Sequence, residues 1–494
     1  MSQFTLNDGL CGGGNVLSAP DRAWTPAELK AQVSQWRDRL REFPELLSGH
    51  ASVGLLLDNG PHWIALDLAC SMLGVAVVPL PDFFTVDQQR HLVSQAQVGV
   101  LLTTQADKAA ALGFSVHGIE ASVDSHDILI SHRAFAPAQR LPEGVHKITF
   151  TSGTTGQPKG VCLSLNQQMA VANALKQVTA PLNIRRHLCL LPMSVLLENI
   201  AGIYAPLLSD ADIACPPLAE TGLKGASSFD AQQCLDTIGR YQAESVILLP
   251  QMLFALLQAT SANDVRVRSL KFIAVGGGKV PPSLLAWASQ LKLPVFEGYG
   301  LSECASVVCL NTPEFTRAGT VGKPLPGVSV KLADDGEILV RGRGYMGYLH
   351  ELQGQADAQV ADEWLPTGDL GTVDTDGFVS INGRKKNLII TGFGRNVSPE
   401  WPESLLLATG LFLQAMVMGD GQEQLSAVLV PRMPMNDDTV DQALATVNAQ
   451  LPDYARIGQR VMATEPFTFD NGMATANGRI RRDAIARHYS GVFA

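Results

Sequence analysis

The ten residues at positions 151–160 carry the side chains best suited to chemistry. They read Thr-Ser-Gly-Thr-Thr-Gly-Gln-Pro-Lys-Gly and follow an apolar run at 148–150. Glycine lets backbone N–H groups approach a ligand closely, hydroxyl groups donate hydrogen bonds, and Lys159 supplies a mobile positive charge. A flexible surface turn uses similar residue types, but a lysine and a proline fixed among them favour a loop that wraps a polyphosphate.

This loop differs from the common nucleotide-binding loop, in which Gly-x-x-x-x-Gly-Lys is followed by Ser or Thr. Counting from Gly153, Pro158 stands where the second glycine is expected. Gly160 follows Lys159, so no hydroxyl is placed there to hold Mg²⁺. The sequence therefore disfavours a kinase or a switch GTPase built on that loop.

Three further segments combine glycine with groups that suit a nucleotide. Residues 297–303 (Glu-Gly-Tyr-Gly-Leu-Ser-Glu) set an aromatic ring between glycines, where it could stack on a base, and Glu303 could hold Mg²⁺. Residues 276–279 (Gly-Gly-Gly-Lys) follow an apolar run, as a strand-to-loop ligand site would. Asp369 could accept hydrogen bonds from ribose hydroxyls at a strand end. Each segment alone could be a turn or a cap; their combination and order carry the prediction.

Alternating helices and strands must position these segments. Thr25-Pro26-Ala27-Glu28 predicts a capped helix start, and buried strands are expected at 53–57, 75–79, 98–104, 245–250 and 271–275. This alternation indicates parallel sheets covered by helices. Short strands and tight turns after about residue 315 predict a β-rich subdomain. We expect an α/β fold with a large N-terminal domain (1–382), a basic hinge (383–386) and a small α+β C-terminal domain (387–494).

Composition limits the classes of protein that fit. The chain has 494 residues, 46% of them apolar and 17% charged, as in a soluble globular enzyme. Its net charge of −10 argues against a general nucleic-acid binder. The eight cysteines form no Cys-x-x-Cys pair, so the sequence suggests neither a zinc site nor a disulfide framework. Reduced cysteines are typical of a cytoplasmic protein, and we expect that location. We expect no signal peptide and no transmembrane segment, because the longest apolar stretch, 63–80, contains Asp67.

Five motifs, taken in order, resemble those of the ATP-dependent adenylate-forming superfamily of acyl-CoA synthetases, luciferases and peptide-synthetase adenylation domains. They are TSGTTGQPKG at 151–160, YGLSE at 299–303, GEILVRG at 336–342, TGDLG at 367–371 and GRKKN at 383–387. The resemblance covers nearly the whole chain. Three further segments look most like medium- and long-chain fatty acyl-CoA synthetases: LPMSVLLEN at 191–199, VGKPLPGVSVKLADDGEI at 321–338 and DNGMAT at 470–475.

The resemblance implies an acid–thiol ligase that works in two half-reactions. An apolar, fatty-type carboxylate attacks the α-phosphate of ATP in the presence of Mg²⁺, which gives an acyl-adenylate and pyrophosphate. A thiol, expected to be that of CoA, then takes the acyl group and releases AMP. Two alternatives stay open: an acyl-AMP ligase that loads the phosphopantetheine of an acyl carrier protein, and a non-catalytic nucleotide-binding homologue.

The resemblance also implies a role for each matching residue. Lys159 and residues 151–156 would hold the β- and γ-phosphates, and Glu303 with Ser302 or Thr154 would organise Mg²⁺ and the α-phosphate. The expected ATP ligands are Thr151, Ser152, Gly153, Thr154, Thr155, Gly156, Gly277, Gly278, Lys279, Glu297, Gly298, Tyr299, Gly300, Ser302, Asp369 and Arg384. Lys386 matches the hinge about which a mobile C-terminal domain would rotate. The expected acyl pocket contains Val195, Gly276 and Leu301, and the expected thiol passage contains Gly392, Phe393 and Gly394.

Three positions depart from the pattern of this superfamily. Ser302 replaces the usual threonine and keeps its hydroxyl, and Val195 replaces a histidine beside the acyl pocket. Arg479 replaces the C-terminal lysine that bridges the carboxylate and the α-phosphate. Arginine keeps the charge and can bind both anions with a planar fork, so we expect Arg479 to be catalytic and to neutralise the adenylation transition state. The rival hypothesis is weak adenylation, with preformed adenylates as the natural substrates.

Overall fold

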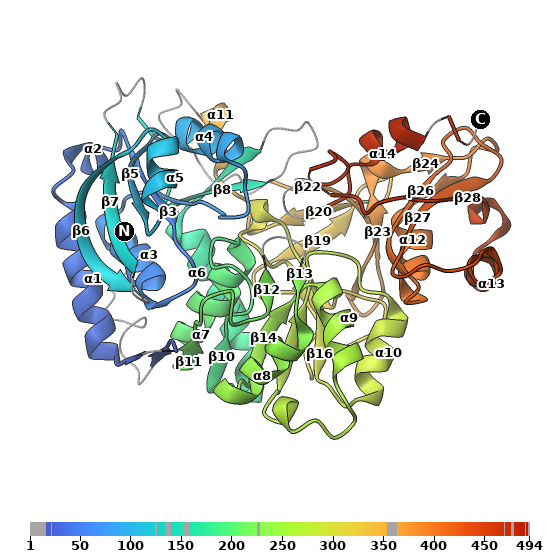
Figure 1. Cartoon of the computed structure of the whole chain (residues 1–494), viewed down its shortest axis with the longest axis horizontal. Coiled ribbons are helices and arrows are strands. Elements are labelled where there is room, and N and C mark those ends of the chain that lie inside the picture. The colour runs from blue at the N-terminus through green and yellow to red at the C-terminus, as the bar shows by residue number, and fades with distance from the viewer. Residues whose placement is uncertain are drawn as a thin grey trace.

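The computed structural model shows sheets with flanking helices and a separate C-terminal unit (Figure 1). It describes residues 16–20, 22–123, 126–133, 140–151, 158–224, 228–352, 363–468, 470–475, 479–489 and 491–492. In Figure 1 the N-terminal residues lie at the left, the middle of the chain lies below the centre, and the C-terminal residues lie at the right. Residues 152–157 of the predicted phosphate loop lie outside the described residues.

The N-terminal sheet has the strand order β21-β9-β8-β4-β3-β5-β7-β6. Its strands are β3 (Ser52–Leu56), β4 (Val77–Pro79), β5 (Val98–Thr103), β6 (Ser115–Val123), β7 (His126–His132), β8 (Lys147–Thr151), β9 (Lys159–Leu163) and β21 (Gly347–Tyr348). The helices of this part are α1 (Pro26–Leu40), α2 (Pro44–Leu47), α3 (Pro61–Leu73), α4 (Val86–Gln95), α5 (Ala106–Ala111) and α11 (Leu349–Leu352). Strands β8 and β9 are antiparallel, and Thr151 pairs with Lys159.

The second sheet has the order β18-β17-β16-β15-β14-β10-β11-β1-β2. Its strands are β1 (Leu17–Ser18), β2 (Ala23–Trp24), β10 (Arg186–Leu188), β11 (Asp212–Ala214), β14 (Ser245–Leu248), β15 (Phe272–Val275), β16 (Val295–Tyr299), β17 (Cys309–Leu310) and β18 (Lys323–Pro324). Strands β11, β10, β14, β15 and β16 are parallel to their neighbours in this series. Their carboxyl ends therefore meet at one edge, which is where ligand sites of such sheets form.

Helices α6 (Leu165–Thr179), α7 (Ala205–Leu208), α8 (Ala231–Tyr241), α9 (Pro250–Ala259) and α10 (Pro282–Gln290) accompany this sheet. A π-helix covers Glu198–Tyr204 and leads directly into α7. The short hairpin of β12 (Leu223–Lys224) and β13 (Ser228–Phe229) precedes α8. Single turns of 3₁₀-helix cover Ala180–Leu182, Val265–Val267, Ser302–Cys304, Lys385–Asn387 and Asp453–Ala455.

The β-rich subdomain expected after residue 315 is an antiparallel sheet with the order β19-β20-β22-β23. Its strands are β19 (Ser329–Leu332), β20 (Glu337–Arg341), β22 (Leu365–Val373) and β23 (Val379–Arg384). One detail differs from the sequence expectation: Asp369 lies within β22, beside an irregularity in its pairing with β23, instead of at a strand end. The segment predicted as the hinge contains the last two residues of β23, Gly383 and Arg384, and the start of the 3₁₀ turn Lys385–Asn387.

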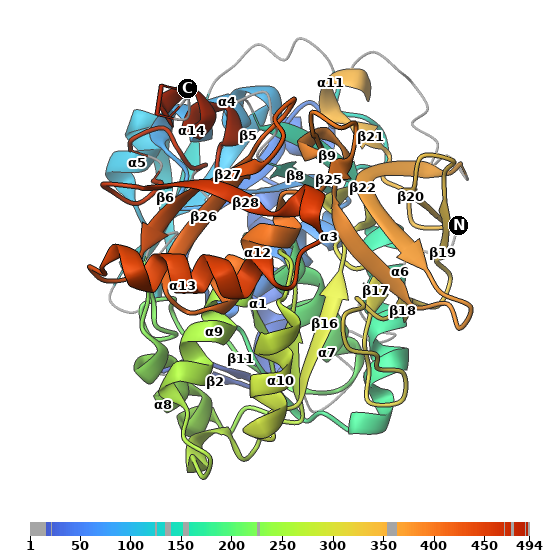
Figure 2. The same cartoon turned by 90° about the vertical axis from the view of Figure 1, so that its right-hand side faces the viewer.

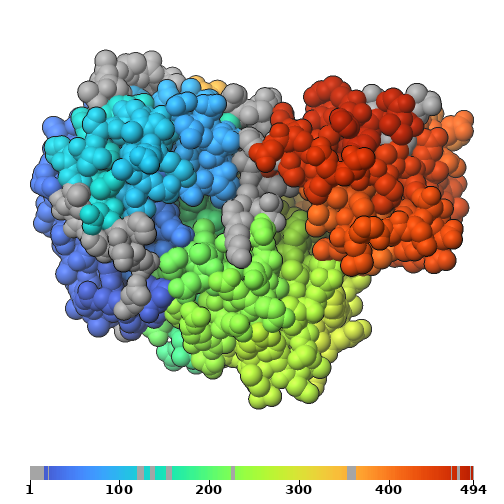
Figure 3. All heavy atoms as spheres, in the orientation of Figure 1, coloured from blue at the N-terminus to red at the C-terminus, as the bar shows by residue number. Residues whose placement is uncertain are grey.

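The C-terminal unit projects at the right in orange and red (Figure 3). It contains β24 (Ile389–Ile390), β25 (Asn396–Val397), β26 (Phe412–Met418), β27 (Leu425–Pro431) and β28 (Ile457–Met462), with α12 (Glu400–Ala408), α13 (Asp437–Asn448) and α14 (Arg482–Tyr489). Figure 2 shows α13 running below the strands of the sheet β26-β27-β28. Arg482 at the start of α14 donates to both carboxylate oxygens of buried Glu403 at 2.6 Å, which ties α14 to α12.

Other sequence expectations hold with small shifts of boundary. Helix α1 begins at the expected capping box, where the Thr25 hydroxyl accepts from the Glu28 N–H at 3.2 Å. Strand β4 starts at Val77, two residues later than expected. Strand β14 stops at Leu248 because Pro250 already begins α9. Among the described residues, no helix combines the length and the apolar character needed to cross a membrane.

Candidate active site

A cavity of about 2580 Å³ lies where the carboxyl ends of β14, β15 and β16 meet β22, β23 and residues of the C-terminal unit. Drug-sized pockets occupy roughly 300–1,000 Å³, so this cavity has room for more than one substrate. It is lined by every predicted site residue that the structure describes, except Gly392, Phe393 and Gly394. The predicted phosphate-loop residues Ser152, Gly153, Thr154, Thr155 and Gly156 lie outside the described residues, and Thr151, at the end of β8, lines the cavity.

Lys159 and Glu303 come together through a residue that the sequence did not single out, Tyr348. The Lys159 ammonium nitrogen lies 5.2 Å from the centre of the Tyr348 ring, a cation–π geometry. The Tyr348 hydroxyl donates to Glu303 Oε1 at 2.8 Å. This leaves the other Glu303 oxygen available for a cation, as the predicted Mg²⁺ role requires. Strand β21 carries Tyr348 against β9, the strand that begins at Lys159.

A second group joins the predicted base, ribose and phosphate residues. The Tyr299 hydroxyl donates to Asp369 Oδ2 at 2.6 Å, and Arg384 Nε lies 2.8 Å from Asp369 Oδ1. Asp369 and Arg384 are direct partners on β22 and β23. Burial raises the pKa of Asp369, while Arg384 and the Tyr299 hydrogen bond oppose the rise. The three side chains hold one another at the cavity wall.

Lys279 and Glu297 line the same cavity, and the pKa of each side chain is shifted from its usual value. Burial raises the pKa of Glu297 to about 7, and the Val280 N–H and the Lys279 charge only partly offset it. Burial also lowers the pKa of Lys279, against the attraction of Glu400 on α12 and of Glu297. Titratable groups with shifted pKa values in a cavity are typical of functional sites.

Glycines allow the backbone to pass very close at this edge. A Cβ on Gly300 would lie 1.5 Å from the Ser306 carbonyl oxygen, so only glycine fits there. Gly277 has a φ of +79°, which few other residues adopt without strain. Ala305 and Ser306 also have positive φ, at 51° and 92°. The chain thus reverses sharply after Tyr299, which turns Ser302 and Glu303 into the cavity.

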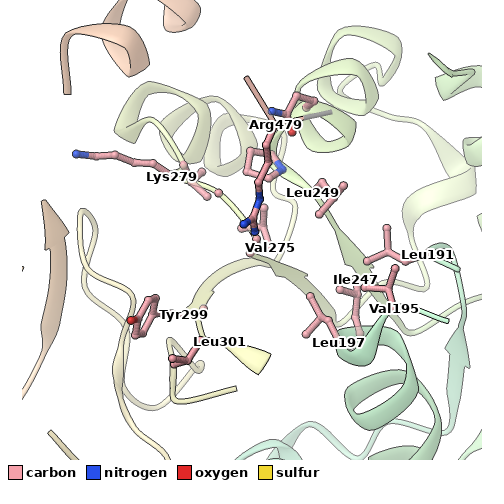
Figure 4. Close-up of a pocket in the computed structure, with 18 of the residues that line it drawn as sticks. Leu191, Val195, Leu197, Ile247, Leu249, Val275, Lys279, Tyr299, Leu301 and Arg479 are labelled. Atoms are coloured by element: carbon pink, nitrogen blue, oxygen red, sulfur yellow. The ribbon is translucent and has the colours of Figure 1, made fainter. Parts of the chain in front are cut away.

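The other side of the cavity is apolar. Figure 4 shows Leu191, Val195, Leu197 and Ile247 grouped on one side, with Lys279 and Tyr299 on the opposite side. The predicted pocket residues Gly276 and Leu301 also line the cavity. An acid with an apolar tail would therefore meet carbon atoms on one side and polar groups on the other.

Arg479 extends between these two sides in Figure 4. Withdrawal from bulk water and the positive charge of Arg384 lower the pKa of Arg479, and the negative charges of Asp369 and Glu303 oppose this. The pKa of Lys386 is lowered by burial and by Arg384 and Arg479. Arg384, Lys386 and Arg479 thus repel one another, and an anion bound among them would relieve that repulsion.

The predicted thiol passage lies elsewhere in this arrangement. Phe393, in the turn between β24 and β25, is 71% exposed. Neither it nor its neighbours Gly392 and Gly394 line the cavity. The C-terminal unit therefore presents Arg479, and not Phe393, to the site.

The comparisons with known proteins place this site in a family. Residues 13–349 match the model described as AMP-binding enzyme, and residues 386–492 match the AMP-binding enzyme C-terminal domain. The first match covers well over half of the chain. The chain belongs to the AMP-binding enzyme family, the adenylate-forming superfamily.

Individual relatives are similar along most of their length. A 3-[(3aS,4S,7aS)-7a-methyl-1,5-dioxo-octahydro-1H-inden-4-yl]propanoyl:CoA ligase of Mycobacterium tuberculosis is 31% identical over 442 residues, with 84% of each chain covered. A long-chain-fatty-acid–CoA ligase of Mycobacterium bovis is 26% identical, covering 87% of this chain and 85% of its own. The O-succinylbenzoate coenzyme A synthetase of Bacillus subtilis, solved in complex with AMP, superposes with a TM-score of 0.75 at 23% identity, covering 97% of this chain and 96% of the other.

Several sequence expectations are confirmed by these findings. The α/β fold with a smaller C-terminal unit matches known structures of the family. An enzyme of the AMP-forming acid–thiol ligase class, with ATP, Mg²⁺ and CoA as its cofactors, is confirmed at the level of the family. The fatty-type substrate is a finer prediction than the family supports.

Proposed function

We propose that the protein is an AMP-forming ligase that activates an apolar carboxylic acid and transfers it to CoA. The observation that carries this proposal is the position of Arg479 between an apolar wall and the side of the cavity that holds Lys279 and Tyr299 (Figure 4). A carboxylate with its tail against that wall would present its oxygens beside the guanidinium. ATP on the other side would present its α-phosphate to the same group.

The chemical problem in the first half-reaction is the approach of two anions. Arg479 would bind the carboxylate and the α-phosphate together, which neutralises both and holds them in line. Lys159 would pair with the outer phosphates, with Thr151 and residues 152–156. Mg²⁺, held through Glu303 with Thr154, would supply further charge neutralisation on the triphosphate. Tyr348 keeps Lys159 and Glu303 in place for these tasks.

The remaining nucleotide contacts follow from the second polar group. Tyr299, flanked by Gly298 and Gly300, would stack on adenine between Glu297 and residues 277–279. Asp369 would bind the ribose, Arg384 would reach the ribose or a phosphate, and Ser302 would donate to the α-phosphate. The support for these roles is that all of these residues line one cavity.

The second half-reaction requires a thiol to reach the acyl carbon. We propose that residues 387–494 form a mobile domain that rotates about a hinge at 383–386, with Lys386 as the pivot. Rotation would withdraw Arg479 and bring Gly392, Phe393 and Gly394 to the cavity to line the thiol passage. The exposure of Phe393 supports this, because an exposed side chain is free to take up a second position.

The acyl group is proposed to be fatty-type, because Val195, Leu191 and Ile247 give the pocket a carbon surface. The named relatives act on acids as different as a fatty acid and a fused-ring propanoate, so the family by itself leaves the acyl group open. A carrier-protein phosphopantetheine is the alternative acceptor. A cytoplasmic location is supported by the cysteines that the structure describes, which are all unpaired and buried.

The test is a screen of carboxylic acids with purified protein, ATP and Mg²⁺, which measures pyrophosphate release and then acyl-CoA formation. We expect apolar acids to release pyrophosphate and CoA to accelerate AMP release. If a holo-carrier protein accelerates AMP release and CoA does not, the acceptor assignment is wrong. If no acid raises pyrophosphate release above the ATP-only background, the proposed function is wrong.

A further inference from the structure

A chain of buried polar side chains lies on the acyl side of the cavity, away from the nucleotide residues. His187 on β10 and Ser245 on β14 are direct partners in neighbouring strands, and His187 Nδ1 lies 2.8 Å from Ser245 Oγ. His187 Nε2 lies 3.1 Å from Oε1 of Glu198, which is 0% exposed. His187 and Ser245 both line the cavity. No role assigned above uses these three residues.

With Glu198 ionised and His187 neutral, the hydrogen bonds set the direction of each proton in this chain. Glu198 Oε2 accepts from the Leu191 N–H at 3.1 Å, and Oε1 faces His187 Nε2. A carboxylate oxygen only accepts, so in that state the single histidine proton lies on Nε2 and Nδ1 is an acceptor. The Ser245 hydroxyl must then donate to Nδ1. Its oxygen lone pairs remain, so Ser245 offers the cavity an acceptor and no proton.

The π-helix that carries Glu198 packs closely over the Glu198–His187 pair. The π-helix Glu198–Tyr204 carries Glu198, and a Cβ on Gly202 would lie 2.2 Å from Glu198 Oε1 and 2.7 Å from His187 Nε2. A larger residue at this position would displace one of these two side chains. π-Helical turns of this kind are frequent at functional sites.

The strand register gives the distance of this acceptor from Gly276, the predicted pocket residue taken here as the position of the reacting carboxylate. Ser245 pairs with Phe272 on β15, and Gly276 lies four residues further on, just past the carboxyl end of β15, beside the nucleotide residues. Four residues of parallel strand span about 13 Å. Ile247 and Ala274, which also pair, line the interval with carbon. An acyl tail that enters at Gly276 would thus cross an apolar stretch and reach Ser245 at its far end.

We propose that the Glu198–His187–Ser245 chain is a specificity device that selects acids whose tail carries a hydroxyl group about 13 Å from the carboxylate. The tail hydroxyl donates to Ser245 Oγ, and the methylenes before it contact Ile247 and Ala274. A plain alkyl tail offers no hydrogen-bond donor to Ser245 Oγ and shields this buried acceptor from water, which makes binding of that tail less favourable. This inference rests on the proposed function and names its substrate class.

The test compares hexanoic, octanoic, decanoic and dodecanoic acids with their ω-hydroxy derivatives, by kcat/KM for pyrophosphate release. At the length that fits, we expect the hydroxy acid to be favoured about fivefold to tenfold, the range of one neutral hydrogen bond. Ser245→Ala should remove that preference. Ser52→Ala is the matched control: Ser52 is a buried strand serine that donates to the Ala96 carbonyl and does not line the cavity, so the preference should remain.

Two results would overturn the inference while leaving the proposed function intact. One is equal kcat/KM for hydroxy and plain acids at every length, or a preference that persists in Ser245→Ala. The other is a stronger preference for ω-oxo acids, which would mean that Ser245 donates. If no acid supports pyrophosphate release, the proposed function fails, and calorimetric binding of the same acid pairs to wild type and Ser245→Ala then decides the inference by the same criterion.

Discussion

Lys159 lies over the ring of Tyr348, with 5.2 Å between its ammonium nitrogen and the ring centre, although the two residues are far apart in the sequence. The hydroxyl of the same tyrosine donates to Glu303. One side chain therefore sets the positions of the proposed phosphate-binding lysine and the proposed metal-binding carboxylate. The ring contacts Lys159 and the hydroxyl contacts Glu303, so different substitutions of Tyr348 can remove one contact or both.

Replacing Tyr348 should affect Mg²⁺ and ATP differently. Tyr348→Phe keeps the ring beside Lys159 but frees Glu303, so we expect the Mg²⁺ concentration for half-maximal activity to rise about threefold with little change in the KM for ATP. Tyr348→Leu also removes the cation–π contact, worth about 0.5–1 kcal/mol, and should raise the KM for ATP as well. Titrations of Mg²⁺ and ATP check this, with Tyr454→Phe, outside the cavity lining, as the control. Equal effects of both Tyr348 variants would contradict the separation.

Arg479→Ala should impair the first half-reaction. Removing one charge-assisted contact from a transition state costs about 3 kcal/mol, or about a hundredfold in rate. We expect that loss in acid-dependent exchange between pyrophosphate and ATP, with a smaller loss for Arg479→Lys, which keeps the charge. Arg460→Ala is the control, because Arg460 pairs with Asp437 and Asp441 away from the cavity. Undiminished exchange in Arg479→Ala would instead support the hypothesis that preformed adenylates are the natural substrates.

Glu297 should make the stability of the protein depend on pH. Its pKa is about 7 in the folded protein and about 4.5 in the unfolded chain, because burial disfavours the carboxylate. Between these values the folded state binds more protons than the unfolded state, so this residue's contribution to stability falls as the pH rises from about 4.5 to 7. The full fall is on the order of 3 kcal/mol, and about 2 kcal/mol of it lies between pH 5 and pH 7. Denaturant unfolding at pH 5 and pH 7 measures it, and Glu297→Gln should show less loss between the two. Parallel pH curves for the two proteins would refute this account.

Gly300→Ala should destabilise the fold at the site. The new Cβ would lie 1.5 Å from the Ser306 carbonyl oxygen, and backbone cannot move aside as a flexible side chain can. We expect a loss of about 3 kcal/mol in the free energy of unfolding, together with weaker ATP binding. Gly60→Ala is a suitable control, since nothing lies within 4 Å of its Cβ position. A variant with unchanged unfolding and ATP affinity would show that the turn relaxes.

The local patterns of the sequence predicted much of the fold. Apolar runs indicated β5 and β15, and the capping box at Thr25 marked the start of α1, because both signals depend only on nearby residues. Boundaries were less certain where two signals overlapped. The apolar run at 245–250 is longer than β14, because its last residue, Pro250, already belongs to helix α9. An apolar run alone does not show where the strand ends and the helix begins.

The sequence predicted the site residues that belong to recognisable motifs. It missed the site residues that come together only through contacts between distant parts of the chain. Asp369 and Arg384 each belong to a motif, but their pairing follows from the register of β22 and β23, which no local pattern states. Tyr348 was missed, although an aromatic residue shortly after the GEILVRG motif was a signal that could have been followed. His187 and Ser245 meet only because β10 and β14, distant in sequence, are neighbours in the sheet.

The C-terminal unit offers two different surfaces from one small body, and only the one bearing Arg479 lines the cavity. A rigid body cannot turn both surfaces toward the same opening at once. If the Phe393 surface serves the thiol, the thiol cannot approach while Arg479 still holds the reacting anions. The order of the two half-reactions would then be enforced by mutual exclusion alone, with no inhibitor and no signal required.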